Sequence, residues 1–193
     1  MIGRIHGLLV EKNPPQVVVV SHGVGYEIDV PMSTFYHLPA TGQAVEMLTH
    51  LVVREDAHLL YGFLTPAERS AFRQLLRISG VGPKVALSVL SGLSVEDLAL
   101  AVAGGDAARL TKVPGVGKKT AERLVLELRD KLPVAMSAQR GAGSTPIASS
   151  DALNALLALG YNDREAQAAL RQQAADLPLA DAIRQALKHL ARP

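Results

Sequence analysis

The chain has 193 residues, a length that fits one large domain or two to three small ones. Its 20 lysines and arginines nearly balance its 18 acidic residues, so the net charge by itself points to no class of partner. The absence of cysteine excludes disulfides and cysteine-based zinc sites, and no apolar run is long enough to span a membrane. We therefore expect a soluble cytoplasmic protein without a leader peptide.

Residues 1–63 predict a small β-barrel. They contain five short runs rich in β-branched or aromatic residues, separated by turn signals such as Asn13-Pro14-Pro15. Five short antiparallel strands hide their edges best by closing on themselves, which favours an oligonucleotide-binding (OB) type barrel. The predicted strands are residues 1–10, 16–21, 25–31, 44–53 and 58–63.

Residues 64–136 predict an all-helical domain. A capping box begins it, with Thr65 as N-cap, Pro66 at the first helical position and Glu68 as the reciprocal acid. Three further helix starts are indicated: Ser94 with Asp97 after it, Asp106, and Gly117 before a long helix that ends ahead of Pro133.

Residues 137–149 are small and polar, as in a flexible linker, and residues 150–193 predict a three-helix, UBA-like domain. Its helical stretches are residues 151–160, 163–174 and 179–190. A small tethered helical domain of this kind typically binds a partner. An apolar face for that contact could include Leu156, Leu159 and Leu170, although these leucines are better explained as the core of the domain.

Charge differs between these segments. Residues 1–63 contain three basic and six acidic side chains, whereas residues 64–133 contain eleven basic and seven acidic ones. An acidic segment therefore lies next to a basic one.

An internal repeat with an offset of 35 residues lies in the helical segment, where "LLRISGVGPKVALSVL" aligns with "LTKVPGVGKKTAERLVL". The second copy is similar to a nucleotide-binding P-loop. It lacks the G-x-x-x-x-G-K-[ST] pattern, because Lys112 replaces the first glycine and Lys119 follows Lys118 where a hydroxyl is required. The G-V-G turns therefore need another explanation.

Each copy resembles the helix-hairpin-helix motif of proteins that bind DNA without sequence specificity. Glycines allow a tight hairpin and a close approach of the backbone to a phosphate, and the first turn of the next helix offers free N–H groups and its dipole. Such a site holds the DNA backbone and distinguishes no bases. The predicted phosphate-binding residues are Gly80, Val81, Gly82, Lys84, Gly115, Val116, Gly117, Lys118, Lys119 and Arg123.

The whole chain resembles the RuvA family of Holliday-junction recognition proteins, through "MIGRIHG", "GVGYE", "VVREDAHLLYGF", "GVGPK" and "PGVGKKTAERL". The resemblance is dense over residues 1–133 and weaker beyond. It implies a non-catalytic protein without a cofactor or metal, which binds four-way junction DNA as a homotetramer or as an octamer. It also implies a hexameric ATPase partner of the RuvB type, bound by the tail, and suggests a resolvase of the RuvC type as a further partner.

The same resemblance gives a role to Glu55 and Asp56, between the last two predicted strands. In the family the matching pair forms an acidic pin, which repels phosphates at the centre of the junction and disfavours uninterrupted duplex. Taken alone, Arg54-Glu55-Asp56 is an ordinary polar turn.

Four other classes of function remain to be weighed. A glycosylase, lyase or nuclease would need a nucleophilic lysine, a general-base aspartate or clustered metal-binding carboxylates, and Asp106 and Asp130 are better explained as a helix cap and a surface charge. A general helix-hairpin-helix duplex-binding protein or repair accessory subunit stays open. A single-strand-binding protein is disfavoured by the acidic, aromatic-poor barrel, and a protein-interaction scaffold would leave the repeats unexplained.

Overall fold

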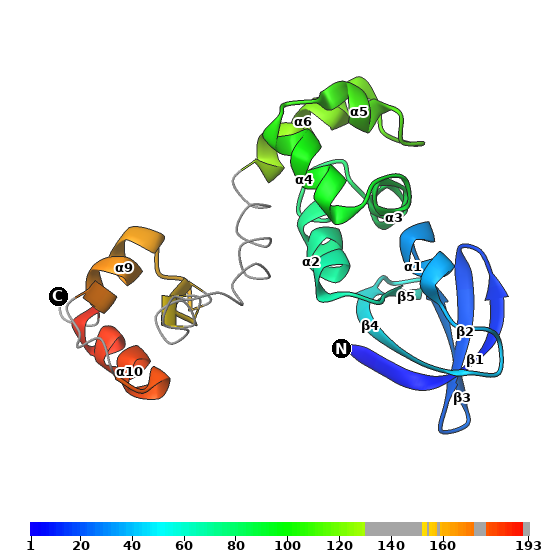
Figure 1. The fold of residues 1–193 in the computed structure, drawn as a ribbon, viewed down its shortest axis with the longest axis horizontal. Coiled ribbons are helices and arrows are strands. Elements are labelled where there is room, and N and C mark those ends of the chain that lie inside the picture. Colours follow the sequence, from blue (N-terminus) through cyan, green and yellow to red (C-terminus); the bar gives the residue numbers. More distant parts are fainter. Residues whose placement is uncertain (130–151, 154, 158, 172–176, 191–193) are drawn as a thin grey trace. The chain divides into compact units, whose positions relative to one another are not determined.

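The computed structural model describes residues 1–129, 152–153, 155–157, 159–171 and 177–190. The chain divides into two compact units, Met1–Gln139 and Arg140–Pro193, and each is described by itself (Figure 1). The predicted linker 137–149 lies outside the described residues, as do Asp130 and Pro133.

The predicted barrel is confirmed. Its strands form a closed sheet in the order β1-β2-β3-β5-β4, and every neighbouring pair is antiparallel except β3 and β5, which are parallel. The strands are β1 (Arg4–Asn13), β2 (Gln16–Ser21), β3 (Val24–Asp29), β4 (Ala44–Val53) and β5 (His58–Phe63). Closure removes the unpaired edges that an open five-stranded sheet would expose.

The barrel is filled by side chains that point inward at alternate positions. Leu9, Val19 and Met47 are completely buried there, from three different strands. Gly62 on β5 is required by this packing, because a Cβ atom would lie 2.6 Å from Cγ2 of Ile28. The interior therefore has no room for a larger residue at position 62.

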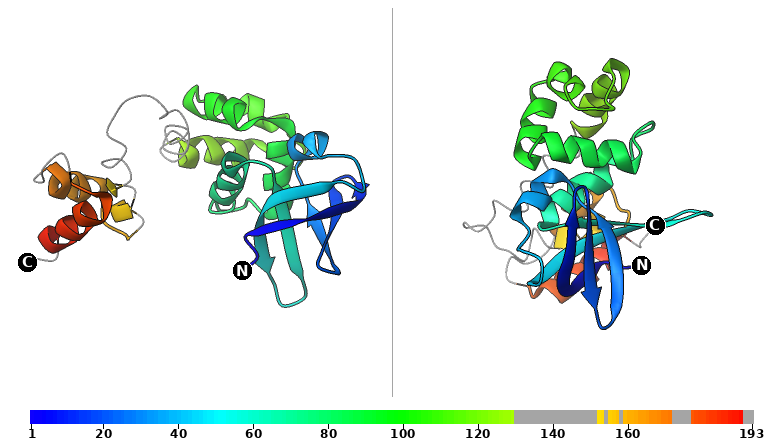
Figure 2. Two further views of the ribbon diagram at one scale, coloured as in Figure 1. Left: turned by 60° about the horizontal axis from the view of Figure 1, so that its bottom comes forward. Right: turned by 90° about the vertical axis from the view of Figure 1, so that its right-hand side faces the viewer.

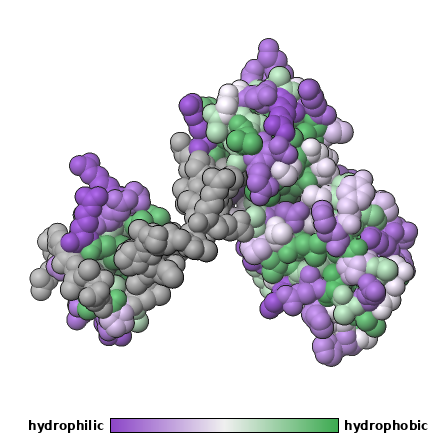
Figure 3. Space-filling view, viewed as in Figure 1, coloured by the Kyte–Doolittle hydropathy of each residue, from purple (hydrophilic) through white to green (hydrophobic). Residues whose placement is uncertain are grey.

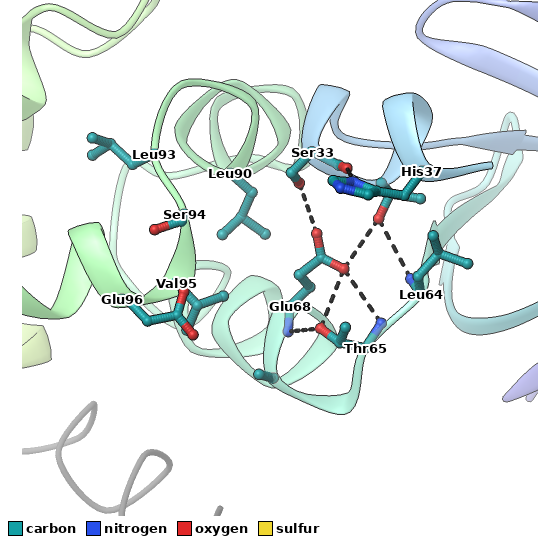
Figure 4. A pocket seen from close by; sticks show the side chains of 12 residues that line it. Ser33, His37, Leu64, Thr65, Glu68, Leu90, Leu93, Ser94, Val95 and Glu96 are labelled. Atoms are coloured by element: carbon teal, nitrogen blue, oxygen red, sulfur yellow. Dashed lines mark hydrogen bonds between the residues drawn. The ribbon is translucent and has the colours of Figure 1, made fainter.

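A short helix, α1 (Met32–His37), joins β3 to β4 and was absent from the sequence prediction. It starts after Pro31 without a side-chain cap, and its six residues are too few for a helical period to be visible. Tertiary contacts hold it in place instead, since Ser33 and Thr34 donate hydrogen bonds of 2.7 and 3.1 Å to the Glu68 carboxylate (Figure 4).

The helical segment contains α2 (Pro66–Leu75), α3 (Pro83–Gly92), α4 (Val95–Ala103), α5 (Ala107–Thr111) and α6 (Lys118–Leu128). The predicted caps are confirmed. Thr65 and Glu68 form a complete capping box, and the side chains of Ser94 and Asp106 accept hydrogen bonds from N–H groups in the first turns of α4 and α5.

Strand β5 contributes to the apolar core of the helices in the first unit, which is separate from the core inside the barrel. Tyr61 and Phe63 of β5 pack on Phe72 of α2, each with 5.0 Å between ring centroids. The N–H of Met32 donates to the Ser91 hydroxyl of α3 over 3.0 Å. These contacts fix the orientation of the repeats on the barrel (Figure 2).

The second unit contains helical turns at residues 152–153 and 155–157, followed by α9 (Asp163–Arg171) and α10 (Leu179–Leu190). Leu156, Ala166 and Ala186 form its small core, and each is completely buried. These helices lie within the stretches that the sequence predicted, and the three-helix architecture is confirmed for the residues described.

Within the described parts of the chain, no single helix is both long and apolar enough to cross a membrane. α3 and α4 have sufficient length and apolar composition only when they are joined, and they are bent by 95°. Hydrophilic side chains cover much of the visible face of the helical segment, with smaller apolar areas between them (Figure 3).

Candidate nucleic-acid interface

The two copies of the repeat adopt the same backbone conformation. The first glycine of each hairpin lies in the left-handed region, with φ of 84° at Gly80 and 85° at Gly115. The second glycine of each is an extended N-cap, with φ, ψ of −86°, 172° at Gly82 and −82°, 168° at Gly117. The repeat seen in the sequence is therefore a repeat of structure.

The valines between these glycines support the hairpins from inside. Val81 and Val116 are 6% and 5% exposed. Their N–H groups donate to the carbonyls of Ile78 and Val113, over 3.0 and 3.1 Å. The sequence analysis placed both valines among the phosphate-binding residues. The structure leaves neither of them a free hydrogen-bond donor, so we assign them to holding the turn.

The helices that follow the hairpins differ from their neighbours at the N-terminus. α2, α4 and α5 each have a side chain that caps the first turn, whereas α3 and α6 begin at glycine without one. An uncapped first turn leaves backbone N–H groups available to an anion, with the positive end of the helix dipole behind them. Of the five helices, only the two in the repeats have this feature.

The space in front of these two helices is open. A Cβ atom added to Gly82 or Gly117 would meet no heavy atom within 4 Å. Packing within the chain therefore does not explain the choice of glycine at these positions. A glycine there lets another molecule approach the backbone closely.

The predicted cationic side chains surround the hairpins. Lys84, Lys118 and Lys119 are exposed, and none of them forms an ion pair with a residue that the structure describes. Arg123 is also exposed, but its Nη1 donates a hydrogen bond of 2.8 Å to the carbonyl of Ser79. Arg123 thus connects α6 to the first hairpin and still presents part of its guanidinium to solvent.

The second hairpin also lies close to the first repeat. A Cβ atom added to Gly115 would lie 3.8 Å from Cγ2 of Val85 on α3. The first hairpin is thus bonded to α6, and the second hairpin lies beside α3. Both uncapped N-termini belong to the same compact unit.

Glu55 and Asp56 lie at the tip of the β4–β5 hairpin. Both are exposed, and the N–H of Arg54 donates to the carbonyl of Ala57 over 2.8 Å to close the turn. The hairpin extends from the body of the barrel (Figure 2). The two carboxylates are presented to solvent and pair with no cation among the described residues.

The three leucines suggested for partner binding lie in different surroundings. Leu156 is completely buried in the core of the second unit, and Leu170 packs against the same core. Leu159 is 60% exposed. A partner that docks on this unit can therefore touch Leu159 directly, while the side chain of Leu156 is inaccessible to it.

Asp29, at the end of β3, is a charged residue near the interface that the sequence analysis missed. Its carboxyl group is partly buried, and burial raises its pKa, while nearby Lys84 acts in the opposite direction. The two residues are 55 positions apart in the sequence, and no motif connects them. Only the packing of the barrel on α3 brings them together.

The acidic residues near the repeats have structural roles. Asp106 caps α5 through the N–H of Arg109 at 3.0 Å, and Asp97 binds the Arg109 guanidinium. Within the described residues, no group of three or more His, Asp or Glu could hold a metal ion. The cleft of about 460 Å³ in Figure 4 contains Glu68, whose carboxylate already accepts hydrogen bonds from Ser33, Thr34 and Thr65.

Comparison with known proteins gives matches along the chain. Three family models match: the RuvA N terminal domain at residues 1–62, a SAM-like helix-hairpin-helix tandem at residues 72–130, and the RuvA C-terminal domain at residues 148–191. The chain is 63% identical over 198 residues to proteins of Azoarcus sp. (strain BH72) and Aromatoleum aromaticum, and 58% identical over 192 residues to one of Paraburkholderia phymatum. All three are named Holliday junction branch migration complex subunit RuvA, and in each comparison both chains are covered completely.

Proposed function

Because the chain belongs to the RuvA family, we propose that it binds Holliday junctions as a subunit of a branch migration complex. The observation that carries this proposal is the pair of equivalent hairpins, each followed by a helix with an uncapped N-terminus, in one compact unit. Two equivalent anion sites suit a backbone with regularly spaced phosphates. They contain no groups that would distinguish bases.

Phosphate binding is assigned to the backbone first and to the lysines second. The N–H groups of the first turns of α3 and α6 would donate to phosphate oxygens, and the glycine N-caps permit the close approach. Lys84, Lys118 and Lys119 add cationic contacts, as does the part of Arg123 not bound to Ser79. Backbone donors release few counterions, so binding should depend less steeply on salt than the number of phosphate contacts suggests.

The exposed carboxylates of Glu55 and Asp56 act by exclusion. Four copies arranged around a junction would bring these pairs to the crossover, where like charges repel the phosphates of an uninterrupted duplex. Separated strands that diverge around the pin meet less repulsion. The pair thus favours a junction over linear DNA without binding any base.

The assembly is a tetramer, or an octamer on DNA, and the subunit does no chemistry of its own. The second copy of the repeat lacks the P-loop pattern, so the force for strand movement comes from a hexameric ATPase of the RuvB type. The C-terminal unit binds that motor, with exposed Leu159 as a candidate contact. A resolvase of the RuvC type can act on the junction held in this way.

A competition gel shift tests the proposal. A labelled four-way junction would be bound by the full chain in about 0.15 M salt, the physiological value, and challenged with excess linear duplex of the same arm sequences. We expect the junction to stay bound. Equal competition by linear duplex would instead make the chain a general helix-hairpin-helix duplex-binding protein.

A further inference from the structure

A cleft of about 640 Å³ lies between the barrel and the first repeat. Its charged lining residues are Asp29, from the end of β3, and Lys84, from the first turn of α3. Ser88 and Ser91 of α3 add hydroxyl groups, and Pro114 of the second hairpin closes one side. The lysine assigned to phosphate binding in the first repeat therefore shares a cleft with a carboxylate.

The Asp29 carboxylate is partly desolvated, and the charge of Lys84 acts on it. It is partly buried, and it accepts no hydrogen bond from any residue that the structure describes. Lys84 is the nearby cation that favours its charged form, while Glu27 on the same strand disfavours it. An exposed ammonium group that shares a cleft with a partly buried carboxylate can bind either that carboxylate or a phosphate.

The second repeat lacks this arrangement. Lys119 occupies the position that matches Lys84, and Lys118 precedes it where the first copy has Pro83, which has no N–H. Lys118 shares a separate cleft with Glu122, which is exposed, and Lys119 lies outside that cleft. The second repeat therefore offers one more cation and one more backbone donor, without a partly buried carboxylate from the barrel.

We propose that Asp29 is a specificity-determining residue of the first repeat, whose carboxylate competes with DNA phosphate for the Lys84 ammonium group. This inference rests on the proposed function. The first repeat consequently holds the backbone more weakly than the second. DNA that is pumped across the protein must release each contact in turn, so a weakened contact at one of the two sites lowers the barrier to that movement.

A double-mutant cycle on linear duplex tests this competition, with the variants Asp29→Asn, Lys84→Gln and both together. Asp29→Asn should tighten binding by about threefold, the size expected for one solvent-accessible charge pair. In the Lys84→Gln background the same change should have no effect, because the competing cation is gone. Glu11→Gln, an exposed barrel carboxylate outside the cleft, serves as the matched control and should change the affinity much less.

The outcomes separate this inference from the proposed function. An Asp29→Asn effect that persists without Lys84, or an equal effect of Glu11→Gln, would mean that only overall charge matters, and the competition would be refuted. Weaker binding by Asp29→Asn would also refute it, provided that thermal unfolding shows an intact fold. Junction preference is measured separately on the wild-type chain. If the wild-type chain shows no such preference, the proposed function is overturned, but the double-mutant cycle on linear duplex can still be interpreted.

Discussion

The guanidinium of Arg123 donates a 2.8 Å hydrogen bond to the carbonyl of Ser79, across 44 positions of sequence. Ser79 directly precedes the left-handed Gly80, so the bond anchors the first hairpin to the helix of the second repeat. The second hairpin lies beside Val85 of α3, so the two anion sites belong to the same compact unit.

Replacing Arg123 with Gln should loosen this connection. We expect a loss of about 0.5–1 kcal/mol in the free energy of unfolding, since the bond is solvent-exposed. Amide hydrogen exchange around Gly80 should become faster. Arg129→Gln removes an exposed arginine at the end of the same helix and is the control. Equal exchange rates in the two variants would contradict the anchoring role.

The two glycines of each hairpin should respond differently to alanine. Gly117→Ala is expected to leave stability within about 0.5 kcal/mol, because its φ of −82° suits alanine and the added Cβ meets no atom. It should nevertheless weaken DNA binding, since the Cβ lies where a phosphate approaches. Gly115→Ala, at φ of 85°, should instead destabilise the fold by about 1 kcal/mol or more.

Chemical unfolding and duplex titration, applied to both variants, separate these effects. If Gly117→Ala binds DNA as the wild type does, then no phosphate comes close to this N-cap, and the backbone contact has to be abandoned.

The lysines should determine the salt dependence of binding. Changing Lys118 and Lys119 to Gln should lower the slope of log K against log salt by about 0.9 for each lost duplex contact. Affinity for unrelated duplex sequences should fall by similar factors, because phosphates have no base identity. Lys188→Gln, in the second unit, is the control and should leave the slope unchanged. An unchanged slope in the double variant would exclude these lysines from phosphate contact.

Removing the charges of the acidic pin should strengthen binding to linear duplex DNA. Replacing Glu55 with Gln and Asp56 with Asn removes two exposed charges without changing side-chain size, so affinity for linear duplex should rise and the preference for a junction should decrease. Glu11→Gln controls for the loss of a barrel charge elsewhere. Duplex affinity that stays constant or falls would restore this turn to an ordinary polar loop.

His50 should make stability depend on pH. Partial burial is the main cause that lowers its pKa, and the nearby positive charges of Arg73 and Arg69 lower the pKa further. Folding therefore favours the neutral ring. That ring accepts a hydrogen bond from Nε of Arg73 at 3.3 Å. For a group whose pKa is lowered by folding, the stabilisation is present above the unfolded pKa of about 6.5 and is lost as the pH falls below it.

Urea unfolding between pH 7.5 and pH 5 measures this effect. His50→Gln keeps an acceptor for Arg73 and cannot titrate, so its stability should fall less over this range than that of the wild type. His189→Gln in the second unit is the control. Identical pH profiles for the wild type and His50→Gln would rule out this linkage.

The sequence by itself determined the order of the elements, the repeat and the helix caps. The capping hydrogen bonds join groups no more than three residues apart, so they follow from residue type and spacing. They are made by Thr65 with Glu68, by Ser94 and by Asp106. The glycines of the hairpins were predictable for the same reason, because the left-handed turn at Gly80 and Gly115 is a local requirement.

Contacts between distant residues were decided by the tertiary structure alone. α1 depends on hydrogen bonds to Glu68, and the N–H groups and side chains of the valines in the hairpins turn inward. The fold also decides which leucine of the second unit is buried, since Leu156 is completely buried whereas Leu159 is 60% exposed. Asp29 shares a cleft with Lys84 only because the barrel closes and packs on α3. The periodicity of a sequence indicates which residues of one helix or strand share a face. It does not indicate which faces of different elements pack against one another.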